Sequence, residues 1–311
     1  MANGEWDPGT AEGLSRRTAL VTGGNGGLGY QAALRLAVHG WRVLVGSRDA
    51  GRGAAAVAAI RALVPGASAG VVGVDLADLS SVRAAASGLV RDDVELDLLV
   101  NNAGVMAVPS RRLTAQGLEL QIGTNHFGHF ALTGLLMPLL LRRAGSRVVT
   151  VTSVAHRWGR LDLADLHCRR RYSPWRAYGA SKLANAVFTV ELGRRLALTG
   201  AGTLSIGAHP GIAATNLGTA GPTLGGRSLF AAPTAWGMRR VGQSPVAGCG
   251  PILRAATDPD AVGGSCYGPQ GMAELRGEPG PVSFRRLACA ERLGQGLWSE
   301  SERLTGVTYP F

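Results

Sequence analysis

Lysine is nearly absent from this chain of 311 residues. Lysine and arginine together number 32, but Lys182 is the single lysine, so arginine supplies almost all of the net charge of +11. The arginines are scattered in short groups, and no long basic run is interleaved with aromatic residues, so we do not expect nucleic-acid binding. An anionic cofactor or a generally positive surface accounts for the charge equally well.

Cysteine is also scarce, and its four positions show no paired spacing. There is no C-x-x-C motif and no cysteine–histidine zinc pattern, and the histidines lack metal-ligand spacing with supporting acids. We therefore expect no metal site and predict free thiols in a reducing compartment, which favours a cytoplasmic location. The cysteines are Cys168, Cys249, Cys266 and Cys289.

Long apolar runs are missing as well. No stretch reaches the roughly 18 apolar residues that indicate a membrane-spanning helix. Residues 1–15 are polar and carry acids, so they predict a flexible lead-in without a signal peptide.

Short apolar runs alternate with segments of helical spacing along most of the chain. This alternation predicts an α/β fold: a single Rossmann-type domain over 16–311, built on a doubly wound parallel sheet of about seven strands with helices on both faces. The predicted strands cover 17–21, 42–45, 71–74, 96–100, 147–152, 203–208 and 264–267. The predicted helices cover 29–39, 54–63, 80–90, 115–141, 175–199 and 245–257.

Residues 212–245 combine glycines and prolines with bulky apolar groups. This composition predicts a substrate lid that closes over an apolar ligand, and the alternative is a surface loop that packs on the core. Trp236 falls in this segment, and Trp158 and Trp175 fall in residues 156–175. These tryptophans either pack in the core or form an apolar wall for the substrate.

A glycine-rich loop, residues 22–29, follows the first predicted strand and opens the first predicted helix. Gly23, Gly27 and Gly29, with Asn25 and Leu28 among them, suit a tight turn that brings a pyrophosphate close to a helix N-terminus. The alternative is an ordinary glycine-rich turn, but the position at a strand-to-helix junction favours the phosphate site.

The end of the second predicted strand indicates the type of cofactor. Ser47 and Arg48 stand where an acidic residue would bind the ribose 2′-hydroxyl of NAD. An arginine at this position accommodates a 2′-phosphate, so the sequence favours NADP(H) over NAD(H). Asp49 lies one residue further on and is available to cap the next helix.

Lys182 follows Tyr178 by four residues, which places both on one face of a helix. An ammonium beside a phenol lowers the phenol's pKa from its reference of about 10, which would let the tyrosine exchange protons near neutral pH. A surface lysine beside an ordinary tyrosine is the alternative when this spacing is taken alone.

Several motifs together resemble the short-chain dehydrogenase/reductase family. They are Thr22-Gly23-x-x-x-Gly27-x-Gly29, Asp75-Leu76, Asn101-Asn102-Ala103-Gly104, Ser153, Tyr178-x-x-x-Lys182 and Pro210-Gly211, and they stand in the family's order over about 16–257. The runs at 125–130 and 153–156 look like those of the branch that includes retinol dehydrogenases and protochlorophyllide reductase.

The resemblance implies cofactor contacts at most of these motifs. The glycine loop would hold the pyrophosphate, Asp75 and Leu76 would contact the adenine, and Asn102, Ala103 and Gly104 would flank the adenosine ribose. Pro210, Gly211 and Thr215 would line the nicotinamide pocket.

The resemblance also implies the catalytic residues. Ser153 would hold the substrate oxygen, Tyr178 would exchange its proton, Lys182 would bind the nicotinamide ribose and tune Tyr178, and Asn125 would kink its helix and hold a relay water. Ser153 and Tyr178 are further apart than in many relatives, so residues 156–175 would shape the substrate mouth or obstruct a dimer contact.

We therefore expect an NADP(H)-dependent carbonyl reductase or alcohol dehydrogenase for an apolar or ring-containing small molecule. It would act as a monomer or homodimer. The alternatives are an epimerase or dehydratase without net cofactor turnover, and a non-catalytic NADP(H)-binding sensor.

Overall fold

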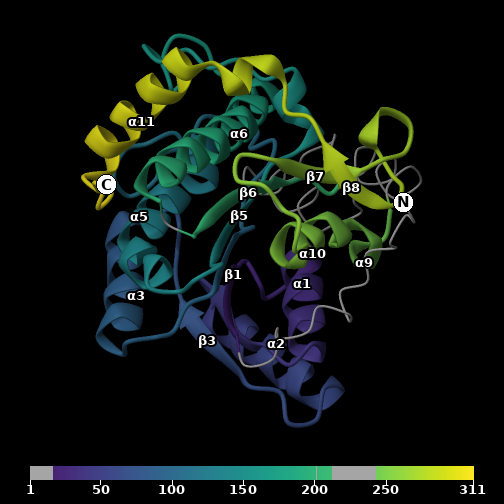
Figure 1. Cartoon of the computed structure of the whole chain (residues 1–311). Coiled ribbons are helices and arrows are strands. Elements are labelled where there is room, and N and C mark those ends of the chain that lie inside the picture. The colour runs from purple at the N-terminus through teal and green to yellow at the C-terminus, as the bar shows by residue number, and fades with distance from the viewer. Residues whose placement is uncertain (1–16, 201, 212–242) are drawn as a thin grey trace.

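A computed structural model describes residues 17–200, 202–211 and 243–311. Its central feature is an eight-stranded sheet in the order β3-β2-β1-β4-β5-β6-β7-β8 (Figure 1). β1 to β7 run parallel, and β8 pairs antiparallel with β7. The strands are β1 (Thr18–Thr22), β2 (Arg42–Ser47), β3 (Ala69–Gly73), β4 (Leu98–Asn101), β5 (Arg147–Val151), β6 (Leu204–Ala208), β7 (Cys266–Pro269) and β8 (Pro279–Val282).

Helices cover both faces of this sheet. The α-helices are α1 (Gly27–Val38), α2 (Ala50–Leu63), α3 (Leu79–Arg91), α4 (Leu120–Ile122), α5 (Gly128–Leu141), α6 (Pro174–Thr199), α9 (Pro245–Gly248), α10 (Gly250–Thr257) and α11 (Glu291–Thr305). A π-helix, η1 (Gly123–Phe127), joins α4 to α5. The 3₁₀ helices are η2 (Val154–Arg157), η3 (Met272–Glu274) and η4 (Arg286–Cys289).

The central strands are apolar on both faces because helices exclude water from both. Every residue of β1 and β4 is buried. Neighbouring side chains on a strand point to opposite faces, so Leu20 packs into a core with Phe130 and Trp298, while Val21 packs into a second core with Leu36. This explains why short apolar runs locate the strands in the sequence.

Aspartate side chains cap the first turns of α2 and α3. Asp49 accepts a hydrogen bond from the Arg52 amide at 2.9 Å and caps α2, as the sequence predicts. Asp78 caps α3 in the same way through Ser80.

The strand count differs from the prediction of about seven, because β8 adds an antiparallel edge strand. β8 contains two prolines and a glycine, a composition typical of turns. Proline is tolerated in a strand at a sheet edge, where its missing N–H is not needed. Helix α11, also beyond the predicted elements, packs along α6 (Figure 1).

The strand order reverses between β1 and β4. In open parallel sheets, ligands bind beyond the carboxyl ends of the strands at such a reversal. Most of the predicted lid, residues 212–242 of 212–245, lies outside the described residues.

Candidate active site

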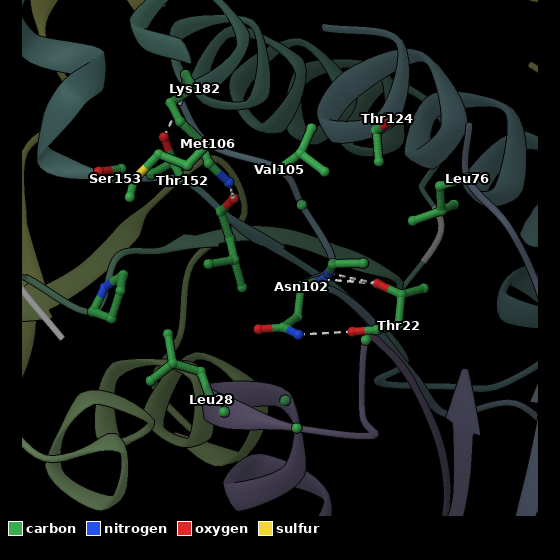
Figure 2. Close-up of a pocket in the computed structure, with 18 of the residues that line it drawn as sticks. Thr22, Leu28, Leu76, Asn102, Val105, Met106, Thr124, Thr152, Ser153 and Lys182 are labelled. Carbon is green, nitrogen blue, oxygen red and sulfur yellow. Dashed lines mark hydrogen bonds between the residues drawn. The ribbon is translucent and has the colours of Figure 1, made fainter. Parts of the chain in front are cut away.

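A cavity of about 540 Å³ lies at the carboxyl ends of the parallel strands. Its walls include all the predicted site residues except Asn125, which lies behind the wall, and Thr215, which lies outside the described residues. Figure 2 shows Ser153, Lys182 and Met106 at one end of this cavity, with Thr22, Asn102 and Leu28 at the other. The chain therefore brings together residues from 22 to 211 at one site.

The glycine loop leaves the N-terminus of α1 open to this cavity. Gly23 has φ +64°, a left-handed backbone that other residues rarely adopt. A side chain at Gly29 would come within 2.4 Å of the Gly23 carbonyl oxygen. The close packing of the loop against the start of α1 therefore requires glycine at position 29. Helix α1 has no side-chain cap, which leaves its first amides free for an anion. The loop therefore fits the pyrophosphate of a dinucleotide.

Thr22 joins this loop to the end of β4. Asn102 donates from Nδ2 to the Thr22 carbonyl at 2.7 Å, and the amides of Asn102 and Ala103 donate to Thr22 Oγ1 at 2.9 and 3.1 Å (Figure 2). The ring of His129 also lies 2.9 Å from Thr22 Oγ1. These bonds hold the end of β1 against the end of β4, and we interpret this part of the cavity as the adenosine side.

Two arginines line the cavity beyond β2. Arg48 and Arg52 are exposed, and the described residues provide no ion pair for either guanidinium. The Arg52 guanidinium lies 3.9 Å from the position of a Cβ on Gly26, so it reaches the glycine loop. Ser47 is buried, and its hydroxyl donates to the Asp49 carbonyl at 2.8 Å. Sequence reasoning missed Arg52, although its i+4 spacing from Arg48 was a usable signal.

Ser153, Tyr178 and Lys182 meet at the other end of the cavity. Ser153 lies two residues beyond the end of β5 and caps η2, where its Oγ accepts from the Ala155 amide at 3.2 Å. Tyr178 and Lys182 are buried on α6, one turn apart. Lys182 Nζ donates to the Val151 carbonyl at 3.0 Å and lies 5.9 Å from the centre of the Tyr178 ring.

The predicted lowering of the Tyr178 pKa is wrong for this chain alone. Burial raises the pKa of Tyr178 to about 12, against a smaller opposing effect from its hydrogen bond with Ser153. Burial also lowers the pKa of Lys182 to about 8. The reason is that desolvation disfavours both charged forms, while the ammonium is directed at a backbone carbonyl.

Asn125 lies in the π-helical turn η1, which supplies the helix irregularity that the resemblance implies. Its Oδ1 accepts from the Val105 amide at 2.8 Å, and its Nδ2 donates to the Val105 carbonyl and to Ser181 Oγ, each at 2.9 Å. Its main-chain carbonyl lies 2.9 Å from His129 Nδ1. Asn125 thus ties the cavity wall at Val105 to α6.

Two tryptophans flank Tyr178 at the cavity mouth. Trp158 is 49% exposed and lies so close to Gly179 that a Cβ there would approach its ring to 2.3 Å. Trp175 is 44% exposed, and its ring meets that of Tyr178 edge-on at 6.3 Å. Tyr172 anchors the intervening segment by donating to the Val108 carbonyl at 2.7 Å. Residues 156–175 therefore shape this mouth.

Two histidines, on η1 and on α5, are packing residues. His126 and His129 are 1% exposed, and burial lowers their pKa values to about 3 and about 4. His126 Nε2 lies 2.9 Å from Ser301 Oγ of α11. Within the described ranges, no three histidine, cysteine or acidic residues converge as metal ligands.

The chain matches the short chain dehydrogenase family over residues 17–221. It is 42% identical to human retinol dehydrogenase 12 over 66% of this chain and 64% of that protein, a little under two thirds of its length. It is 40% identical to mouse polyprenol dehydrogenase over 94% of this chain and 84% of that protein. Among solved structures it resembles an uncharacterised protein from Mycobacterium paratuberculosis, with 40% identity, a TM-score of 0.76, and coverage of 98% and 99% of the two chains.

This chain therefore belongs to the short-chain dehydrogenase/reductase family, in the branch of the retinol dehydrogenases. That membership places it among NAD(P)-dependent oxidoreductases. Among the described helices, none combines the length and apolarity needed to cross a membrane.

Proposed function

We propose that this chain is an NADP(H)-dependent carbonyl reductase or alcohol dehydrogenase for apolar or ring-containing small molecules. The observation that carries this proposal is the convergence of Ser153, Tyr178 and Lys182 at one end of the cavity whose other end is the open glycine loop. A bound nicotinamide would supply or accept the hydride of the reaction.

The walls of the cavity suggest how a dinucleotide would be held. The free amides at the start of α1 suit the pyrophosphate, and Asp75 and Leu76 line the adenosine end. Arg48 and Arg52 face this end without ion-pair partners in the described structure, which supports a preference for the 2′-phosphate of NADP(H). Lys182, at the opposite end, would contact the nicotinamide ribose.

The proton chemistry falls to Tyr178. In the reductive direction its hydroxyl gives a proton to the substrate oxygen, which Ser153 orients by a hydrogen bond. The raised pKa of about 12 keeps Tyr178 protonated in the free chain, as a proton donor requires. Lys182 stabilises the tyrosinate left behind, because its ammonium lies on the same helix face.

The mouth of the cavity supports an apolar substrate. Trp158 and Trp175 present partly exposed indoles beside Tyr178, and Met106 joins a small apolar cluster with Tyr178. Retinol and polyprenol, in the names of two relatives, are alcohols with long apolar bodies. We propose substrates of that general chemistry, with burial against the indoles as the main attraction.

Turnover with NADPH over a panel of aldehydes and ketones tests this function. Tyr178→Phe removes only the proton donor, so turnover should fall by at least about 1,000-fold while NADPH affinity changes less than about threefold. Tyr30→Phe, at a tyrosine outside the cavity walls, is the matched control and should retain wild-type turnover.

Substantial turnover by Tyr178→Phe would contradict the catalytic assignment. Net consumption of NADPH distinguishes this reaction from epimerisation or dehydration, in which the hydride returns to the substrate. NADPH binding without turnover of any compound in the panel would instead favour the sensor.

A further inference from the structure

Glu274, on η3 outside the cavity, bridges two elements that carry cavity-lining groups. Its Oε2 accepts a hydrogen bond from His209 Nε2 at 2.9 Å, and its Oε1 pairs with the guanidinium of Arg157. His209 directly precedes the Pro210-Gly211 turn of the cavity wall, and Arg157 ends the η2 helix that Ser153 caps. One carboxylate therefore connects η2 to the residue that directly follows β6.

The hydrogen bonds of His209 determine its tautomer. His209 is fully buried, and burial lowers its pKa to about 4, so the ring is neutral near pH 7. Its Nδ1 accepts from the Gly211 amide at 3.3 Å, which places the single ring proton on Nε2. That proton is donated to Glu274. Without the carboxylate, the buried N–H would lose its only acceptor among the described residues.

The backbone around Glu274 is held in a conformation that favours glycine. Ala273 and Glu274 have φ values of +53° and +55°. Two successive non-glycine residues in this region persist only where the surroundings hold them. The same loop presses on the cavity wall, because a side chain at Gly211 would come within 2.3 Å of the Leu275 carbonyl.

We propose that Glu274 is a positioning residue that clamps the Pro210-Gly211 turn and η2 against each other, and so sets the wall on the nicotinamide side of the cavity. This inference rests on the proposed dinucleotide site. It assigns a role in the reaction to a residue beyond the 17–221 match to the family. Loss of the clamp should impair only the Ser153 end of the cavity, since Glu274 contacts nothing at the glycine loop in the described structure.

Two ligands of different reach test this clamp. Adenosine 2′,5′-bisphosphate would occupy the adenosine end, whereas NADPH would occupy both ends. Glu274→Gly removes the carboxylate and also relieves the left-handed backbone, so the fold should survive. By isothermal titration we expect this variant to bind the bisphosphate within twofold of the wild-type affinity and to bind NADPH at least fivefold more weakly. In steady-state assays of turnover, its kcat should be at least tenfold lower than that of wild type.

Two further variants serve as comparisons. Glu274→Gln keeps an acceptor for His209 but loses the charge toward Arg157, so its NADPH affinity should lie between those of Glu274→Gly and wild type. Glu278→Gly changes the same residue type at an exposed position of the same loop and should match wild type.

The measured affinities decide whether Glu274 acts as a clamp. If Glu274→Gly lowers the affinities for both ligands equally, or leaves NADPH binding and turnover unchanged, the clamp is overturned while the proposed function stays intact. If Glu274→Gln binds NADPH as weakly as Glu274→Gly does, the hydrogen bond from His209 to residue 274 does not hold the cavity wall. A wild-type chain that binds neither ligand would overturn the dinucleotide site, and the clamp with it.

Discussion

The pKa values of Tyr178 and Lys182 show how burial controls individual residues in this site. Burial alone accounts for the lowered pKa of Lys182, and it is the largest influence on Tyr178. A lysine with a pKa of about 8 still carries most of its charge at pH 7. The ammonium is therefore available to stabilise charge that develops on the tyrosine during proton transfer, even though it does not ionise the tyrosine beforehand.

Arg48 and Arg52 should determine cofactor choice together. Arg48→Asp should lower kcat/KM for NADPH by at least tenfold and reverse or flatten the preference over NADH, because it replaces a phosphate partner with a like charge. Arg52→Ala should lower kcat/KM for NADPH by about three- to tenfold and leave that for NADH within twofold.

Steady-state kinetics with both cofactors provide the measurement. Arg42→Ala is the matched control, since Arg42 is exposed at the opposite end of β2. If Arg48→Asp shows the wild-type ratio of NADPH to NADH activity, then Arg48 does not contact the 2′-phosphate.

At the scale of elements, the mouth formed by η2 and the start of α6 should select the substrate. Trp158→Ala should raise KM for bulky apolar aldehydes about tenfold, because less apolar area is buried on binding. It should change KM for a small polar ketone less than about threefold. Since Trp158 is half exposed, the melting temperature should change little.

Leu198→Ala is the comparison for an apolar surface residue, because Leu198 is 76% exposed near the end of α6, far along the helix from Tyr178. Equal changes in KM for bulky and small substrates would show that Trp158 is not part of the substrate wall.

The sequence predicts the parallel strands and their helices well, because buried apolar runs and capping acids are local signals. The positions of Ser47, Asn102 and Ser153 at strand ends follow from those strands, so the cavity walls are predictable too. Other features depend on contacts between distant segments. Edge strand β8 and the pairing of Glu274 with His209 leave no local pattern.

For the whole molecule, the buried histidines predict how stability depends on pH. Burial lowers the pKa values of His126, His129 and His209 to about 3, 4 and 4, whereas unfolded histidine titrates near 6.5. Between about pH 6.5 and 4 the unfolded chain binds more protons than the folded chain. The free energy of unfolding should therefore fall as pH falls through this range, by up to about 1.4 kcal/mol per pH unit for each histidine.

Urea unfolding at pH 8, 7, 6 and 5 measures this dependence. The free energy of unfolding should change little from pH 8 to 7 and then decrease toward pH 5. Burial raises the pKa of Glu119, which acts in the opposite direction, but it is one group against three. A free energy of unfolding that stays constant from pH 7 to 5 would contradict the assignment of neutral buried histidines.

The late position of Glu274 and α11 in the chain has a consequence for synthesis on the ribosome. The glycine loop, Ser153, Tyr178 and Lys182 are all translated before the segment that carries β7, β8 and α11. Trp298 packs against Phe130 and Phe188, and Tyr309 donates to the Phe130 carbonyl at 2.8 Å. A nascent chain arrested near residue 260 would thus hold every proposed catalytic side chain but lack the aromatic partners that pack on α5 and on α6, the helix of Tyr178 and Lys182, so catalytic competence should appear only after residue 309 has left the exit tunnel.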